Sequence, residues 1–191
     1  MSSLKADFDE LRERIRQGRE LSDASFEPIF YLVFPPRQIL EVKRQLPAWQ
    51  SRLHKDGWSV QTFSIADEIQ AILKDDPRRP LWLEADRADP SNWAAVNDAL
   101  ANALTSSGLL QQRLETFLTS LEQQDNSLAL ITDLEALHPY LRIGAIESQL
   151  QGKFNLPTIF LYPGVRAGKS GLRFLNFYPA DGNYRSVHVG G

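Results

Sequence analysis

Three short runs of apolar residues constrain this chain most, because each has the length of a β-strand. They are residues 28–34 (PIFYLVF), 127–132 (SLALIT) and 158–162 (TIFLY). Continuous apolar runs of this length are typical of strands buried on both faces. The segments between them are longer and show helical spacing, and strands that alternate with such helices form βαβ units. The sequence therefore predicts an α/β fold with a mainly parallel central sheet and helices on both faces.

The helices are predicted from apolar residues that recur every three or four positions. Residues 1–20 have this pattern at Leu4, Phe8, Leu11 and Ile15, which indicates an amphipathic N-terminal helix. The spacing also predicts a helix over residues 39–53, a short helix over 67–73 after a strand at 58–65, two helices over 93–121 divided at Gly108, and a helix over 141–154.

Residues 157–191 form a C-terminal group of strands in this prediction. Runs at 158–162, 172–177 and 184–189 are separated by short turns. Short connections join antiparallel strands. We therefore expect an antiparallel C-terminal hairpin, with the last two strands as an antiparallel edge or flap. The 191 residues, 42% of them hydrophobic, suffice for one core, so residues 1–191 are predicted to be a single α/β domain.

Charge and composition exclude several classes of protein. The net charge is −3 and the chain has no cysteine, which excludes a thiolate zinc site and a cysteine nucleophile. The N-terminal segment is charged throughout, and no apolar run approaches the roughly 20 residues of a membrane helix. A cytoplasmic protein without membrane contact is expected. Residues 127–191 carry 6 basic and 4 acidic groups, against 5 and 11 in residues 57–126.

The stretch LYPGVRAGKSGLR at residues 161–173 contains Gly-Lys-Ser and invites comparison with a phosphate-binding loop. In a P-loop, four residues separate the first Gly from Gly-Lys-Ser/Thr, and that position here is Pro163. A P-loop also leads into a helix, whose N-terminus binds the phosphates. The residues after Ser170 instead have the pattern of a strand, so the stretch is interpreted as the connection of a β-hairpin.

Asp133 follows the strand SLALIT at the position where a Walker B carboxylate would bind magnesium. The first strand, however, is followed by Phe34-Pro35-Pro36-Arg37-Gln38, which lacks both the Gly and the Lys of a phosphate loop. The sheet is thus predicted to resemble a P-loop NTPase core that lacks the phosphate loop. Asp133 is then a turn or cap residue.

Other polar clusters do not form a recognisable catalytic or metal-binding set. Glu84, Asp86 and Asp89 are interpreted as a solvated acidic loop, and Asp133, Glu135 and His138 have no established metal-ligand spacing. No nucleophile motif is present. The sequence predicts no catalytic, cofactor-binding or metal-binding residues and no cofactor.

One basic and aromatic group remains as a candidate contact surface. Arg166, Lys169 and Arg173 lie in or beside the predicted hairpin loop, and Tyr184 and Arg185 lie near the next strand. Arg and Tyr are enriched at protein interfaces, and Arg also contacts phosphates. These five residues are candidate partner or phosphate contacts, with plain solvated charge as the alternative.

The order of these features over nearly the whole chain resembles the BrxB family of the bacteriophage exclusion (BREX) systems. The most specific parts are LPTIFLYPG at residues 156–164, LRFL at 172–175 and Asn183-Tyr184-Arg185. The resemblance implies a small cytoplasmic, non-enzymatic accessory or scaffold subunit of an antiphage defence system. It also implies association with PglZ, the alkaline-phosphatase-like component of the same system.

Two alternatives to the accessory subunit stay open from the sequence. The chain could bind ATP or GTP through residues 163–170 with Asp133 on magnesium, or contact DNA, indirectly or weakly, through its basic C-terminal third. A homodimer through the apolar helix seams is also conceivable. The accessory-subunit hypothesis is preferred because it agrees with the missing phosphate loop.

Overall fold

The computed structural model describes residues 3–20, 27–168, 171–181 and 186–191. The strands are β1 (Ile29–Phe34), β2 (Ser59–Ser64), β3 (Ser127–Thr132), β4 (Thr158–Ala167), β5 (Gly171–Phe174) and β6 (Val187–Gly190). The helices are α1 (Leu4–Glu20), α2 (Ile39–Lys55), α3 (Ile65–Asp75), α4 (Arg79–Ala88), α5 (Trp93–Ser106), α6 (Leu109–Glu122) and α7 (Ile143–Gln149). Two 3-10 turns, η1 (Pro36–Gln38) and η2 (Leu134–Leu137), follow β1 and β3.

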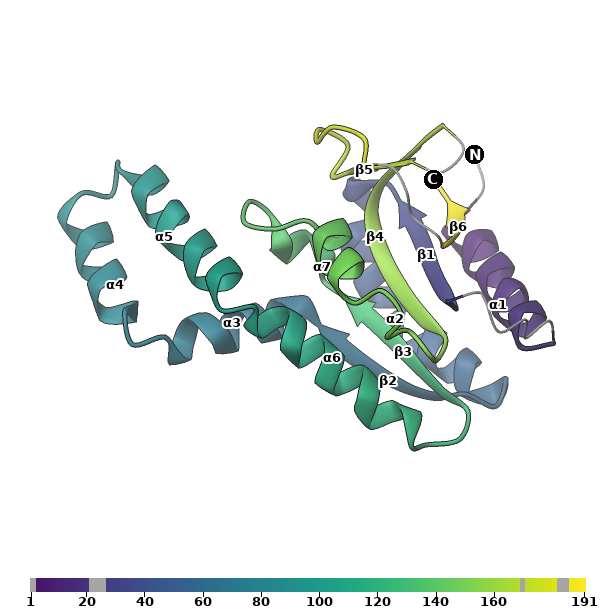
Figure 1. The fold of residues 1–191 in the computed structure, drawn as a ribbon. Coiled ribbons are helices and arrows are strands. Elements are labelled where there is room, and N and C mark those ends of the chain that lie inside the picture. The colour runs from purple at the N-terminus through teal and green to yellow at the C-terminus, as the bar shows by residue number, and fades with distance from the viewer. Residues whose placement is uncertain (1–2, 21–26, 169–170, 182–185) are drawn as a thin grey trace.

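The centre of the molecule is a parallel sheet with the strand order β2-β3-β4-β1-β6 (Figure 1). The pairs β2–β3, β3–β4, β4–β1 and β1–β6 are all parallel. β5 pairs with the end of β4 in antiparallel fashion, with Gly164 opposite Phe174. The predicted α/β class, the mainly parallel sheet and the hairpin between β4 and β5 are therefore confirmed.

Alternation along the strands divides the core into two layers, one on each face of the sheet. On one face Leu32 and Leu161 pack with the apolar stripes of α1 and α2. On the other face Tyr31 and Phe160 pack with α3, α6, α7 and η2. β1 and β3 are buried at every position, which explains why their sequences are continuous apolar runs.

The pairing of the last strand was predicted wrongly. β6 does not pair with β5 but lies parallel to β1, with His188 opposite Tyr31. β5 runs antiparallel to β4, whereas β6 runs parallel to β1 and therefore to β4. The chain does reverse direction between β5 and β6, but β6 adds to the free edge of β1 instead of to β5. Residues 182–185 of this connection lie outside the described part of the chain.

The acidic stretch near residue 84 was also predicted wrongly, because it is helical and not a loop. Glu84 and Asp86 lie within α4, and Asp89 caps its C-terminus. Pro80 is compatible with this helix because it occupies the first turn of α4, where a missing N–H costs nothing. The helix predicted over residues 141–154 is shorter, since α7 ends at Gln149.

Helices α4 and α5 form an arm that projects from the sheet, at the left of Figure 1. α4 packs against α5 and the adjoining α3. Only the second half of α5 reaches the core, through Ala103 and Leu104. The arm is defined here as residues 77–106.

Candidate interaction surfaces

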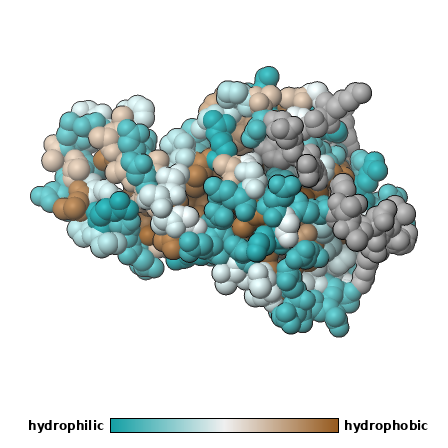
Figure 2. Space-filling model, in the orientation of Figure 1, coloured by the Kyte–Doolittle hydropathy of each residue, from teal (hydrophilic) through white to brown (hydrophobic). Residues whose placement is uncertain are grey.

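The outer part of the arm is the most exposed helical region of the described chain. Between residues 77 and 95 every residue except Trp82 is exposed. The exposed set includes large apolar side chains: Leu81 is 64% exposed and Trp93 is 67% exposed. Figure 2 shows brown, hydrophobic residues among teal and white ones on the surface of the arm. Solvent-exposed Trp and Leu on a projecting element are typical of a surface that binds another protein.

Charged residues of both signs surround these apolar side chains. Residues 76–98 contain three arginines and five carboxylates, so the arm has no positive field that would attract nucleic acid. Arg78 pairs with Asp76 at 2.7 Å, and its guanidinium lies 5.4 Å from the centre of the Trp82 ring. Apolar area with mixed charge and arginine is the composition of a protein interface.

The structure does not join Arg166 and Arg173 into one cluster. Both are exposed on the hairpin, but Arg166 lies opposite Leu172 and Arg173 lies opposite Val165. Paired residues of a ladder share a face and neighbours along a strand do not, so the two arginines point to opposite faces. Each therefore offers a separate contact.

The other predicted contacts cannot be placed. Lys169, Tyr184 and Arg185 lie outside the described residues. The chain around Gly-Lys-Ser is nevertheless clear: β4 continues through Gly164 to Ala167, and a strand, β5, follows. The hairpin interpretation of this stretch agrees with the structure.

Asp133 is held in a network at the carboxyl end of the sheet. Its carboxylate lies 2.6 Å from the Lys43 ammonium and accepts hydrogen bonds from Thr132 at 2.6 Å and Ser64 at 3.0 Å. Burial alone would raise the pKa of Asp133, but the hydrogen bonds from Lys43, Thr132 and Ser64 outweigh it and lower the pKa. Asp133 thereby ties α2 to the ends of β2 and β3.

Asp133, Glu135 and His138 do not converge on a common point. Glu135 shares Lys43 with Asp133 at 2.8 Å, whereas His138 hydrogen-bonds Tyr178 and stacks edge-on with Phe177. Within residues 3–20, 27–168, 171–181 and 186–191, no group of three His, Asp or Glu side chains is placed to hold a metal ion. In the same ranges, none of the helices has the length and apolar character needed to cross a bilayer.

A half-buried acid that the sequence did not indicate lies on α7 and faces β1. Glu147 accepts a hydrogen bond from the hydroxyl of Tyr31, which is fully buried in β1. Burial raises the pKa of Glu147 to about 7, the Tyr31 hydrogen bond opposes the shift, and the nearby carboxylates Glu27 and Asp181 add to it. No spacing rule connects a strand Tyr with a Glu 116 residues later, so only the fold reveals this contact.

These observations define an α/β protein with a parallel sheet, a projecting helical arm and surface features suited to protein contacts. The sequence profile of the family described as "BREX protein BrxB" matches residues 78–189, which include nearly all of the arm, the whole of β3, β4 and β5, and all but the last residue of β6. The chain belongs to the BrxB family and is a component of a BREX antiphage defence system. No curated protein and no solved structure matches it significantly, and the likeness to a P-loop core stays a prediction.

Proposed function

We propose that this BREX component is an accessory subunit without enzyme activity of its own, and that it acts by binding another BREX protein through its arm. The observation that carries the proposal is the exposure of Leu81 and Trp93 on an element outside the sheet. Burying side chains of this size contributes about 1.5–3 kcal/mol each. A partner that covers the arm would gain that energy.

The expected partner is the PglZ-like component, which the resemblance to the BrxB family implies. The arm suits a protein partner better than a nucleic acid, because its carboxylates outnumber its arginines. Trp and Arg are the residues that most often dominate binding energy at protein interfaces. Trp82, Trp93 and Arg79 are therefore the expected anchors.

The test is co-purification of the tagged protein from cells that carry the complete defence system. The informative variant is Leu81→Glu, which replaces one of the exposed apolar side chains of the arm by a charge. Its matched control is Leu40→Glu, since Leu40 is 66% exposed on α2, away from the arm. We expect the PglZ-like protein to co-purify with the original chain and with Leu40→Glu, and to be lost with Leu81→Glu.

Thermal unfolding of both variants provides the folding control. Both should unfold within about 2 °C of the original chain, because surface substitutions change stability by at most about 0.5 kcal/mol. Retention of the partner by Leu81→Glu would disprove docking through the arm. Loss in both variants would point to a general defect and would also contradict the proposal.

The hairpin arginines supply a rival location for the same function. Arg166→Glu and Arg173→Glu reverse charges on opposite faces of the hairpin and can be compared in the same assay. If the arm alone binds the partner, both variants retain it. Loss in one of them would assign the contact to one face of the hairpin. Titration of ATP with magnesium into the purified chain tests the nucleotide alternative, and the present proposal expects no binding.

A further inference from the structure

The outer edge of β2 is open along a strand that has none of the usual protections of a sheet edge. β2 reads Ser-Val-Gln-Thr-Phe-Ser and contains no charge, no Pro and no Gly. Natural sheets protect exposed edges with charged residues, Pro, bulges, short strands or a covering element, because an open edge pairs with other chains. Among the described residues, β2 pairs with β3 alone.

The backbone groups that face this edge follow from the strand register. The N–H of Ser59 donates to the carbonyl of Asn126 at 2.9 Å, so Ser59 points its backbone groups toward β3. Groups alternate along a strand in a parallel pair, which directs Gln61 and Phe63 to β3 as well. The N–H groups of Val60 and Thr62 therefore face outward, where they can donate hydrogen bonds to the carbonyl groups of an added strand.

The opposite edge of the same sheet is built differently. β6 has four residues, and its last residue, Gly190, has a φ of +78° that ends the extended conformation. α1 lies against β6, and the Asp7 side chain is close to Gly190. A short strand with a helix beside it has the features that discourage pairing. The two edges of the sheet therefore differ: the edge at β6 is protected against pairing and the edge at β2 is open.

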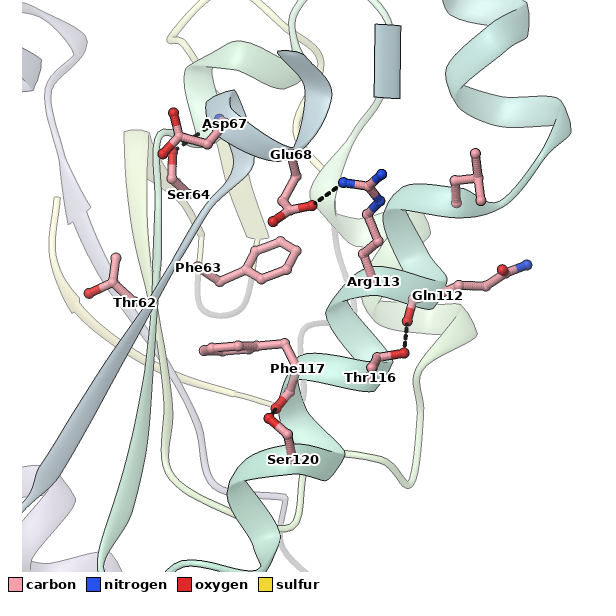
Figure 3. Close-up of a pocket in the computed structure, with 11 residues that line it drawn as sticks. Thr62, Phe63, Ser64, Asp67, Glu68, Gln112, Arg113, Thr116, Phe117 and Ser120 are labelled. Carbon is pink, nitrogen blue, oxygen red and sulfur yellow. Dashed lines mark hydrogen bonds and ion pairs between the residues drawn. The ribbon is translucent and has the colours of Figure 1, made fainter. Parts of the chain in front are cut away.

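A groove of about 740 Å³ lies beside the open edge, between β2 and α6 (Figure 3). Phe63 and Phe117 lie at its base with ring centres 5.2 Å apart, and Phe117 is half-buried. α6 contributes Gln112, Thr116 and Ser120 at every fourth position along the wall. This spacing places all three on one face of the helix, as Figure 3 shows.

The polar wall has hydrogen-bonding capacity left for a ligand. The hydroxyl of Thr116 donates to the carbonyl of Gln112 at 2.8 Å, and that of Ser120 donates to the carbonyl of Phe117 at 2.7 Å. Each hydroxyl oxygen keeps lone pairs that can accept from a ligand N–H. The amide of Gln112 adds donors. The wall can therefore satisfy a polar backbone as well as side chains.

The charges at one end of the groove favour a basic group. Arg113 is paired with Glu68 at 2.8 Å across the groove. Asp67 lines the same end. Its carboxylate accepts no hydrogen bond from the described residues and forms no ion pair with them. A groove with one neutralised pair and one further carboxylate attracts a cation.

We propose that the groove between β2 and α6 binds an extended segment of another protein of the same defence system, which adds to β2 as a strand. The segment pairs its backbone with Val60 and Thr62, places an apolar side chain over Phe117 and a basic side chain beside Asp67. An extended chain is the occupant that satisfies an unpaired strand edge and presents alternate side chains to a groove. This site is separate from the exposed part of the arm and does not rest on the proposed function.

The test uses overlapping synthetic peptides of about 12 residues from the other proteins of the system, long enough to cover a six-residue strand. Binding is measured by fluorescence anisotropy and mapped by amide hydrogen exchange. We expect a peptide with alternating apolar and polar residues and at least one Lys or Arg to bind. It should slow the exchange of the Val60 and Thr62 amides, because their N–H groups become hydrogen-bonded.

Two pairs of variants localise the site. Thr62→Pro removes an outward N–H without breaking the β2–β3 ladder, since Pro is tolerated where the N–H of an edge strand faces solvent. Thr62→Val loses the hydroxyl but keeps the N–H. Thr116→Trp fills the groove, whereas Thr119→Trp adds the same ring to an exposed position of α6 that does not line it. We expect affinity to fall about tenfold or more in Thr62→Pro and Thr116→Trp and to stay within about twofold in the two controls.

Several outcomes would overturn the proposal. One is that no peptide binds, and another is that a peptide binds all four variants with the same affinity. A third is a concentration-dependent dimer that Thr62→Pro abolishes, because the occupant would then be β2 of a second copy. Leu81→Glu separates the two proposals: it should leave peptide affinity unchanged even if it abolishes co-purification of the PglZ-like protein.

Discussion

Trp49 and Trp93 show how differently the sheet layers and the arm use the same kind of helix. Both tryptophans belong to apolar spacings that predict a helix. Trp49 of α2 is 3% exposed and stacks on Phe8 of α1 with ring centres 4.5 Å apart, whereas Trp93 at the start of α5 is 67% exposed. Helical periodicity therefore indicates which side chains share a face, but not whether anything in the same chain covers that face.

Replacing each of these two tryptophans by alanine should give the largest difference in the free energy of unfolding. Trp49→Ala should lower the free energy of unfolding by about 3–5 kcal/mol, because it leaves a cavity between α1, α2 and the sheet. Trp93→Ala should change it by less than about 0.5 kcal/mol, since its side chain is solvated. Chemical denaturation of both variants checks this. A large loss of stability in Trp93→Ala would mean that the arm is a structural element, as the sheet layers are.

Two glycines, Gly164 and Gly18, test how closely the elements of the sheet layers pack. At Gly164 a Cβ would lie 2.3 Å from the carbonyl oxygen of Arg173 and 2.6 Å from the Tyr162 ring, so Gly164→Ala forces β4 and β5 apart. Overpacking of this kind costs about 1–3 kcal/mol. At Gly18, in α1, the nearest atom is at an ordinary 3.7 Å, and Ala is the better helix former.

Thermal denaturation should therefore show opposite signs for the two substitutions. Gly164→Ala should lower the midpoint, and Gly18→Ala should leave it unchanged or raise it. Equal behaviour of both variants would contradict the close approach at Gly164. The contact also gives a physical reason for glycine in the stretch LYPG, which from the sequence was assigned to the turn and not to the strand.

The buried carboxyl of Glu147 predicts a pH effect that the arm should lack. Because its pKa is raised to about 7 from an ordinary value of 4.5, the folded state binds more protons than the unfolded state between these values. Stability therefore falls as pH rises from about 4.5 to 7 and stays lower above that. Glu147→Gln keeps an acceptor for Tyr31 and removes the charge.

We expect Glu147→Gln to be more stable than the original chain at pH 8 by on the order of 1 kcal/mol, and to have no such advantage at pH 4. Urea titrations at the two pH values measure the difference. Glu84→Gln, at an exposed position of α4, is the matched control and should not change the pH dependence. A constant effect of Glu147→Gln at both pH values would mean that the carboxyl is not protonated in the fold.

The elements that the sequence predicted well are those whose own pattern determines them. β1 and β3 are buried on both faces, so their apolar runs identify them, and α2 and α6 follow their apolar spacing. The partner of β6 was not predictable in this way. It depends on which edge of β1 is free once β4 has paired, which is a property of the whole sheet.

The interaction surfaces were predictable only in part. The sequence named Arg166 and Arg173 but could not show that the ladder turns them to opposite faces. It interpreted Glu84, Asp86 and Asp89 as a loop because runs of charged residues are usually solvated, whereas the structure places them in α4 and at its C-terminal cap. The open edge of β2 depends on the strand order of the whole sheet, which the sequence of β2 alone does not indicate.

The smallest predicted difference concerns two surface ion pairs. Asp56 accepts two hydrogen bonds of 2.7 Å from Arg12, which joins the end of α2 to α1, whereas Asp76 bonds Arg78 two residues away in the chain. Asp56→Asn should cost about 0.2–1 kcal/mol at neutral pH, because it weakens a contact between two packed helices. Asp76→Asn changes a local contact at the base of the arm and should leave global unfolding unchanged.

Hydrogen bonding to Arg12 lowers the pKa of Asp56 despite partial burial, so its contribution is present above about pH 4 and is lost as the pH falls further. Denaturation at pH 7 and pH 3 should therefore show a deficit of Asp56→Asn at pH 7 that shrinks at pH 3, and an equal deficit for Asp76→Asn would show that the arm is coupled to the sheet after all.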